Sequence, residues 1–140
     1  MSPGSTRTGG VLEDMVLPAL RHGGYGCRPQ ANVGKRLGLG AHNVDCIATR
    51  GDRSVLISVK WQQVSGTAEQ KVPFEVICLL DAMDKNPGMY AKAYVVLGGE
   101  GWKLRGYFTS GALMKYINYS DKVEIMTLEG FIGRANTGRL

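Results

Sequence analysis

Residues 45–75 read DCIATRGDRSVLISVKWQQVSGTAEQKVPFE, and this stretch decides the fold. Two apolar runs, 44–48 and 55–59, stand on either side of the short polar sequence Arg50-Gly51-Asp52-Arg53. Runs rich in Val and Ile that are joined by a Gly-containing turn are typical of two antiparallel strands. The stretch therefore predicts a β-hairpin.

Polar side chains interrupt the apolar pattern at the end of the second predicted strand. Ser58, Lys60 and Gln62 share one face of it because strand side chains alternate with a period of two. An ammonium among apolar residues is costly to bury without a charged partner. Asp45 on the neighbouring strand and Glu75 in the next element are natural partners. Two carboxylates and one ammonium at a strand end form a site for a divalent cation and for phosphate chemistry.

This arrangement resembles the PD-(D/E)XK nuclease superfamily, whose motif is an acid on one strand and acid-x-Lys on the next. Here Ser58-Val59-Lys60 has a serine in place of the second acid. A subgroup of type II restriction enzymes also carries Ser-x-Lys and takes the missing carboxylate from a Glu on the following helix. The resemblance implies that Glu75 is this residue, with Glu69 as the alternative.

The family also carries a Glu on its first helix. Glu13 fits that place, and the adjacent Asp14 is the alternative. The resemblance implies a metal-dependent DNA endonuclease of the restriction, homing or junction-resolving type. Its cofactor would be Mg²⁺, for which Mn²⁺ can substitute. The implied catalytic residues are Asp45, Lys60, Glu75, Glu13 and Ser58, and the implied metal ligands are Asp45, Glu75, Glu13 and the carbonyl of Val59.

The glycine-rich segment 31–41 shows neither helical nor strand periodicity, so we expect a loop there. It lacks the Gly-Lys-Ser/Thr of a nucleotide-binding loop, whereas its cations suit a DNA backbone that enters the site. A plain surface loop is the alternative. His42, which follows this loop, has no metal-ligand spacing and is a weaker candidate for a DNA contact. The predicted nucleic-acid contacts are Arg28, Lys35, Arg36, Arg50, Arg53 and Gln62.

The remaining elements are predicted from periodicity and from Gly and Pro stop signals. They are a helix at 11–21, a short strand at 25–30, a helix from 68 or 73 to 86, a strand at 92–97, an edge strand or extended loop at 103–108, a short helix at 110–117, a strand at 123–126 and a helix at 128–135. This order predicts an α/β fold with a mixed central β-sheet flanked by helices, as in the restriction-endonuclease-like core.

The chain has 140 residues and a formal net charge of +5. We expect a flexible tail at 1–8 and a single nuclease-like domain at 9–140. The sequence lacks the apolar stretch of a membrane span or signal peptide, so we expect a cytoplasmic protein without membrane contact. The positive charge agrees with DNA as the partner.

Cleavage of two strands by a chain with one site requires a homodimer or a higher homo-oligomer. The alternative function is a nuclease-like module that binds nucleic acid without cleaving it, which the serine at position 58 suggests.

Overall fold

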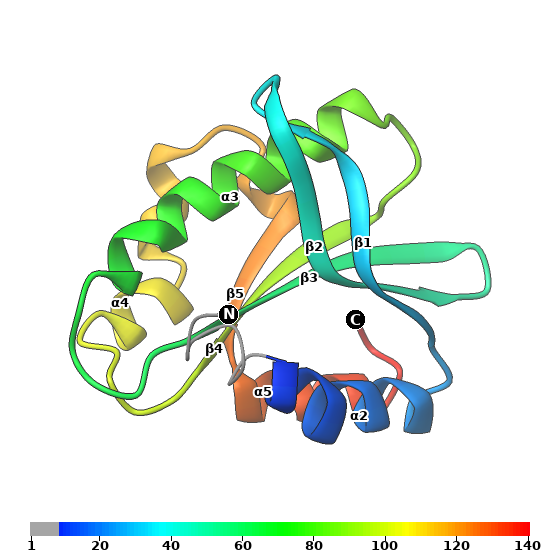
Figure 1. The fold of residues 1–140 in the computed structure, drawn as a ribbon, viewed down its shortest axis with the longest axis horizontal. Helices are drawn as coiled ribbons and strands as arrows, with labels where there is room; N and C mark the ends of the chain where they lie inside the picture. The colour runs from blue at the N-terminus through cyan, green and yellow to red at the C-terminus, as the bar shows by residue number, and fades with distance from the viewer. Residues whose placement is uncertain (1–8) are drawn as a thin grey trace.

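A mixed five-stranded sheet forms the centre of the molecule (Figure 1). The computed structural model describes residues 9–140, and the predicted tail at 1–8 lies outside them. The strands lie in chain order across the sheet; the first two neighbouring pairs are antiparallel, and the last two are parallel. They are β1 (Gly26–Arg36), β2 (Leu39–Arg50), β3 (Arg53–Trp61), β4 (Lys92–Gly98) and β5 (Val123–Thr127).

Helices cover both faces of this sheet (Figure 1). The long helix α3 packs on one face, and η1, α2 and α5 pack on the other. The helical elements are η1 (Leu12–Val16, a π-helix), α2 (Leu17–His22), α3 (Ala68–Lys85), α4 (Arg105–Thr109), the 3₁₀ turns η2 (Ala112–Tyr116) and η3 (Ser120–Lys122), and α5 (Leu128–Asn136). The predicted α/β fold with a mixed, helix-flanked sheet is confirmed.

Strand β3 shows how the sheet supports two cores. Val55, Ile57 and Val59 pack against η1, α2 and α5, whereas Leu56 packs beneath α3. By the same alternation, Ser58 and Lys60 belong to the α3 face. No helix between residues 9 and 140 combines the length and the apolar character that a membrane span requires.

The prediction of a loop at residues 31–41 is wrong. Strand β1 continues to Arg36, and β2 begins at Leu39. The two strands are joined by a two-residue turn in which Leu37 and Gly38 both have positive φ angles, 51° and 81°. Such turns normally carry Asn, Asp or Gly at their first position. Because position 37 carries Leu, the sequence lacks the usual signature of such a hairpin.

The β1–β2 ribbon is twisted halfway along its length, so that its side chains change from one core to the other. Cys27 and Cys46 pack on the side of α2 and α5, but Ala31 and Val44 pack under α3. The change occurs at Gln30, whose φ is 50°, opposite the part of β2 that contains Asp45. The outer part of the ribbon consequently lies against α3 (Figure 1).

One further prediction is wrong, while the others are confirmed with shifted ends. Residues 103–108 form no strand, because α4 begins at Arg105. The spacing of Leu104 and Phe108 is in fact helical, and Phe108 is the buried residue of the turn. Helix α3 begins at Ala68 and contains Pro73 in its interior.

Candidate active site

Asp45 lies where β2 separates from β3. The last paired residues of these strands are Cys46 and Ile57, and beyond them the Asp45 carboxylate accepts a hydrogen bond from the Val59 N–H at 2.6 Å. Burial raises the pKa of Asp45, and the negative charge of Glu75 adds to this rise, whereas the Val59 N–H and Lys60 oppose it. The carboxylate is thus held in a place where its charge is poorly solvated.

Lys60 stands near the end of β3, on the strand next to Asp45. Its Nζ lies 3.3 Å from Oε2 of Glu75, and about a quarter of the side chain is exposed. Ser58, two residues earlier on the same face, is buried. The polar face predicted for this strand therefore points toward α3, where the displaced carboxylate was expected.

Glu75 projects from α3 toward the sheet, and it is 3% exposed. Its carboxylate meets side chains from three strands: Arg36 Nη1 at 3.3 Å and Lys60 Nζ at 3.3 Å on Oε2, and His42 Nε2 at 3.5 Å on Oε1. Burial alone would raise the pKa of Glu75. The hydrogen bond from His42 and the charges of Lys60 and Arg36 outweigh it and lower this pKa to about 2. Glu75 is therefore ionised at any ordinary pH.

The alternative acids lie elsewhere. The carboxylate of Glu69 accepts a hydrogen bond from the Leu104 N–H, away from Lys60. Glu13 and Asp14 are exposed on η1, which packs on the sheet face opposite α3. The structure thus brings Asp45, Lys60 and Glu75 together, and it does not bring Glu13 to them.

The predicted nucleic-acid contacts separate into three groups. Arg36 belongs to the site itself, while Arg28 and Lys35 are exposed on β1. Arg50 and Arg53 flank the turn at the opposite end of β3 from Lys60, and they donate hydrogen bonds to the carbonyls of Gly138 and Leu140.

Gln62, the last predicted contact, is buried. Its amide donates to the carbonyl of Gly101 at 2.7 Å and accepts from the Ala68 N–H at 3.0 Å. The side chain therefore ties the end of β3 to the start of α3, and this structural role leaves it no exposed group for a phosphate.

Sequence reasoning missed His42 as a member of the site. The ring is 1% exposed, donates through Nε2 to Glu75, and has an Nδ1 that finds no hydrogen-bond partner within residues 9–140. The glycine-rich residues before it give no strand periodicity, so the sequence does not place His42 on a strand. A strand beginning at Leu39 would have placed His42 within a paired ribbon, although it would not have shown which helix the ribbon meets.

The donor set suits a hard divalent cation. Asp45 and Glu75 supply carboxylate oxygens, and they lie close enough that the charge of Glu75 raises the pKa of Asp45. No three His, Cys, Asp or Glu side chains within residues 9–140 form a group that could hold a metal ion. Mg²⁺ commonly binds through only one or two carboxylates and completes its shell with water and substrate phosphates. Two carboxylates beside an open strand end fit that pattern.

Comparison with known proteins finds a matching family model. The family model for a PD-(D/E)XK nuclease superfamily domain matches residues 4–139 of the chain. Proteins of this superfamily are generally hydrolytic nucleases and typically use divalent metals. A search of curated proteins found no match.

Among solved structures, the chain is similar to the crystal structure of a protein of unknown function, AF1548. The TM-score is 0.50 and the sequence identity is 11%, with 80% of this chain and 54% of that chain covered. The chain thus spans about half the length of that protein. At this identity, the likeness concerns the fold alone.

Proposed function

Because this chain belongs to the PD-(D/E)XK nuclease superfamily, we propose that it is a metal-dependent endonuclease that hydrolyses phosphodiester bonds in DNA. The observation that carries the proposal is the meeting of Asp45, Lys60 and Glu75 from β2, β3 and α3. Glu75 supplies from a helix the acid that is absent at Ser58. The site thereby keeps two carboxylates and one lysine despite the altered motif.

Each residue of the proposed site has a separate task. Asp45 and Glu75, with the carbonyl of Val59, would hold Mg²⁺ or Mn²⁺. Such a cation stabilises charge on a phosphate and makes water a stronger acid. Lys60, an ammonium that is only partly exposed, would bind the phosphate that is cleaved and stabilise its developing negative charge. Ser58 would orient its neighbours through a hydroxyl hydrogen bond.

The proposed DNA path follows β1 toward the site. Arg28 and Lys35 are exposed on this strand, and Arg36 reaches Glu75 from its end. Cations in such a row suit contacts to successive phosphates, which position a duplex without reading its sequence. Arg50 and Arg53 lie at the other end of β3 from Lys60, and Gln62 is buried, so the proposed path leaves these three residues out.

The test is cleavage of supercoiled, linear and branched DNA by the purified protein, with Mg²⁺ and with EDTA. We expect cleavage with Mg²⁺ or Mn²⁺, none with EDTA, and none for Lys60→Ala under either condition. Cleavage that continues in EDTA would contradict the metal-dependent mechanism. Undiminished cleavage by Lys60→Ala would place the active site elsewhere.

A second function is favoured by one observation. The carboxylate of Glu75 is already paired with Lys60 and Arg36, and position 58 carries no acid. A module that binds nucleic acid without cleaving it would need no more than this. DNA binding that EDTA leaves unchanged, together with no cleavage of any DNA or RNA form, would support this alternative.

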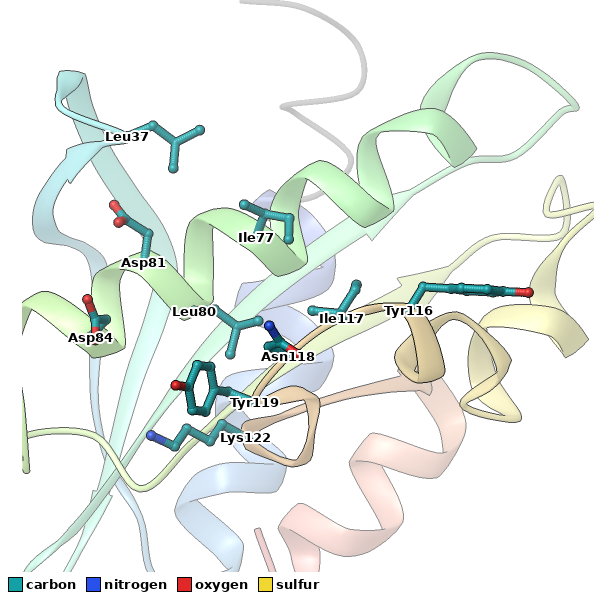
Figure 2. Close-up of a pocket in the computed structure, with 10 residues that line it drawn as sticks. All are labelled: Leu37, Ile77, Leu80, Asp81, Asp84, Tyr116, Ile117, Asn118, Tyr119 and Lys122. Atoms are coloured by element: carbon teal, nitrogen blue, oxygen red, sulfur yellow. The ribbon is translucent and has the colours of Figure 1, made fainter.

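We further propose that the enzyme acts as a homodimer, because one site per chain cuts one strand. A candidate surface is the α3 hollow, a cavity of about 590 Å³ between α3, the β1–β2 turn and the segment after η2 (Figure 2). Its lining residues are Leu37, Ile77, Leu80, Asp81, Asp84, Tyr116, Ile117, Asn118, Tyr119 and Lys122.

The chemistry of the α3 hollow suits a second copy of the chain. The side chains of Ile77 and Tyr119 are large and exposed, and the hollow is also lined by Asp81, Asp84 and Lys122. A twofold interface pairs a surface with itself, so it benefits from charges of both signs.

Replacing Ile77 by lysine is expected to dissociate the dimer. The substitution places two like charges near the symmetry axis, and lysine is a good helix former, so α3 should stay intact. A central apolar contact is worth about 2 kcal/mol, so the dissociation constant should rise roughly thirtyfold. Sedimentation equilibrium measures this, with Val64→Lys as a control because Val64 is 76% exposed outside the hollow. A wild-type protein that is monomeric on DNA and in solution would contradict the proposal.

A further inference from the structure

Both oxygens of the Glu75 carboxylate are already in contact with other side chains. Oε1 receives the hydrogen bond from His42, and Oε2 lies 3.3 Å from both Arg36 and Lys60. Glu75 is also 3% exposed, so few water molecules can reach its carboxylate. A cation that binds Oε2 must therefore compete with two positively charged side chains for that oxygen.

Charge makes the same point. Two carboxyl side chains, Asp45 and Glu75, meet two cationic side chains, Arg36 and Lys60, in the site. Even with both carboxyls ionised, the positive charges already equal the negative charges before any ligand binds. A divalent cation would add two positive charges to a partly buried region, which is costly unless negative charge accompanies it.

Among the partners of Glu75, Arg36 is the one that a ligand can draw away from the carboxylate. Its side chain is 34% exposed, and it meets Glu75 through a single nitrogen at 3.3 Å. It also stands at the end of β1, beside the Leu37-Gly38 turn and next to the exposed Lys35. A guanidinium binds a phosphate with two parallel hydrogen bonds, which is a stronger arrangement than this one contact.

We propose that Arg36 couples cation binding to DNA binding. Without DNA, Arg36 occupies the Glu75 carboxylate and lowers its affinity for a cation. When DNA is bound, a backbone phosphate binds the guanidinium of Arg36 and draws it away from Glu75. This removes one competing positive charge from Glu75 and brings negative charge to the site. This inference rests on the proposed nuclease function, and it assigns Arg36 a positioning role that links the DNA surface to the metal ligands.

The test measures Mn²⁺ binding by electron paramagnetic resonance rather than cleavage. Wild type, Arg36→Met and Lys35→Met are titrated with Mn²⁺ alone and with a short phosphorothioate duplex that resists hydrolysis. Lys35→Met is the matched control because it removes the same charge from the neighbouring exposed residue. Arg36→Gln is a second variant in case the Met substitution disturbs folding, which circular dichroism checks.

For wild type, the duplex should tighten Mn²⁺ binding by at least about tenfold, which corresponds to ~1.4 kcal/mol of coupling. Arg36→Met or Arg36→Gln should bind Mn²⁺ about tenfold more tightly than wild type without DNA, and the duplex should add little. Lys35→Met should bind DNA more weakly while its DNA-free Mn²⁺ affinity equals that of wild type.

Two results would overturn the inference, and they are distinguishable. Equal DNA-free Mn²⁺ affinities for wild type and both Arg36 variants would reject the coupling, while Mg²⁺-dependent cleavage by wild type would leave the nuclease function standing. No Mn²⁺ binding by wild type with or without DNA, together with no cleavage, would reject both.

Discussion

Replacing Glu75 by glutamine is expected to reduce single-turnover DNA cleavage by roughly a thousandfold, the order found when a preorganised charged group is removed from an active site. The amide keeps the size of the side chain but loses the charge that would hold a cation. Glu69→Gln is the matched control, because Glu69 contacts the Leu104 N–H and should be dispensable for cleavage. Loss of cleavage in the control and full activity in Glu75→Gln would assign the displaced acid to Glu69.

The same variant should also be less stable at neutral pH. The pKa of Glu75 is lowered from 4.5 to about 2 in the folded protein. A depressed carboxyl pKa stabilises the folded state above the unfolded value, here by about 3 kcal/mol, and this contribution disappears as the pH falls from about 4.5 to 2. Urea denaturation at neutral pH and at pH 3 measures the difference between wild type and Glu75→Gln.

We expect that difference to shrink as the pH falls, because protonated Glu75 resembles glutamine. A difference that is the same at both pH values would mean that the charge of Glu75 contributes nothing to stability. Cleavage by Glu75→Gln should be assayed well below its melting temperature, so that lost activity is not confused with unfolding.

Replacing Asp45 by asparagine is expected to abolish cleavage to a similar extent and to have the opposite effect on stability. The pKa of Asp45 is raised in the folded protein, so its ionised form is disfavoured there. A raised carboxyl pKa stabilises the folded state only at low pH, and that contribution is lost as the pH rises through the folded value. At neutral pH, the neutral amide should therefore melt at a higher temperature than wild type.

Asparagine retains an oxygen that can accept the hydrogen bond from the Val59 N–H, so the end of β2 should keep its geometry. Asp52→Asn in the exposed β2–β3 turn is the control, and it should change neither cleavage nor melting temperature. A less stable Asp45→Asn protein would show that Asp45 serves chiefly to hold β2 against β3.

Local patterns in the sequence were sufficient for most elements. The β2–β3 hairpin follows from two apolar runs and a Gly-containing turn, and β4 follows from a continuous apolar run that parallel strands covered on both faces require. The same local patterns paired Asp45 with Lys60, because neighbouring strands of a hairpin bring such residues together. Each of these inferences depends on contacts between residues close in the chain.

The choice between Glu69 and Glu75 could not be made this way. Both acids lie close to the apolar stripe of α3 that contains Val72, Val76 and Leu79, so periodicity places both near the buried side. Only the way in which α3 docks on the sheet sends Glu75 to Lys60 and Glu69 to the backbone of Leu104. Docking depends on the shape of the whole sheet, which no window of sequence contains.

The sequence by itself determined the α/β fold and the β2–β3 hairpin and singled out the strand acid and lysine of the candidate site, because these follow from periodicity and turn chemistry. The tertiary structure alone decided that Arg36 and His42 meet Glu75, across 39 and 33 residues of chain. That contact exists because the β1–β2 ribbon turns over at Gln30 and leans on α3. A positive φ at a non-glycine residue leaves no pattern in the sequence, yet it selects the partners of the central carboxylate.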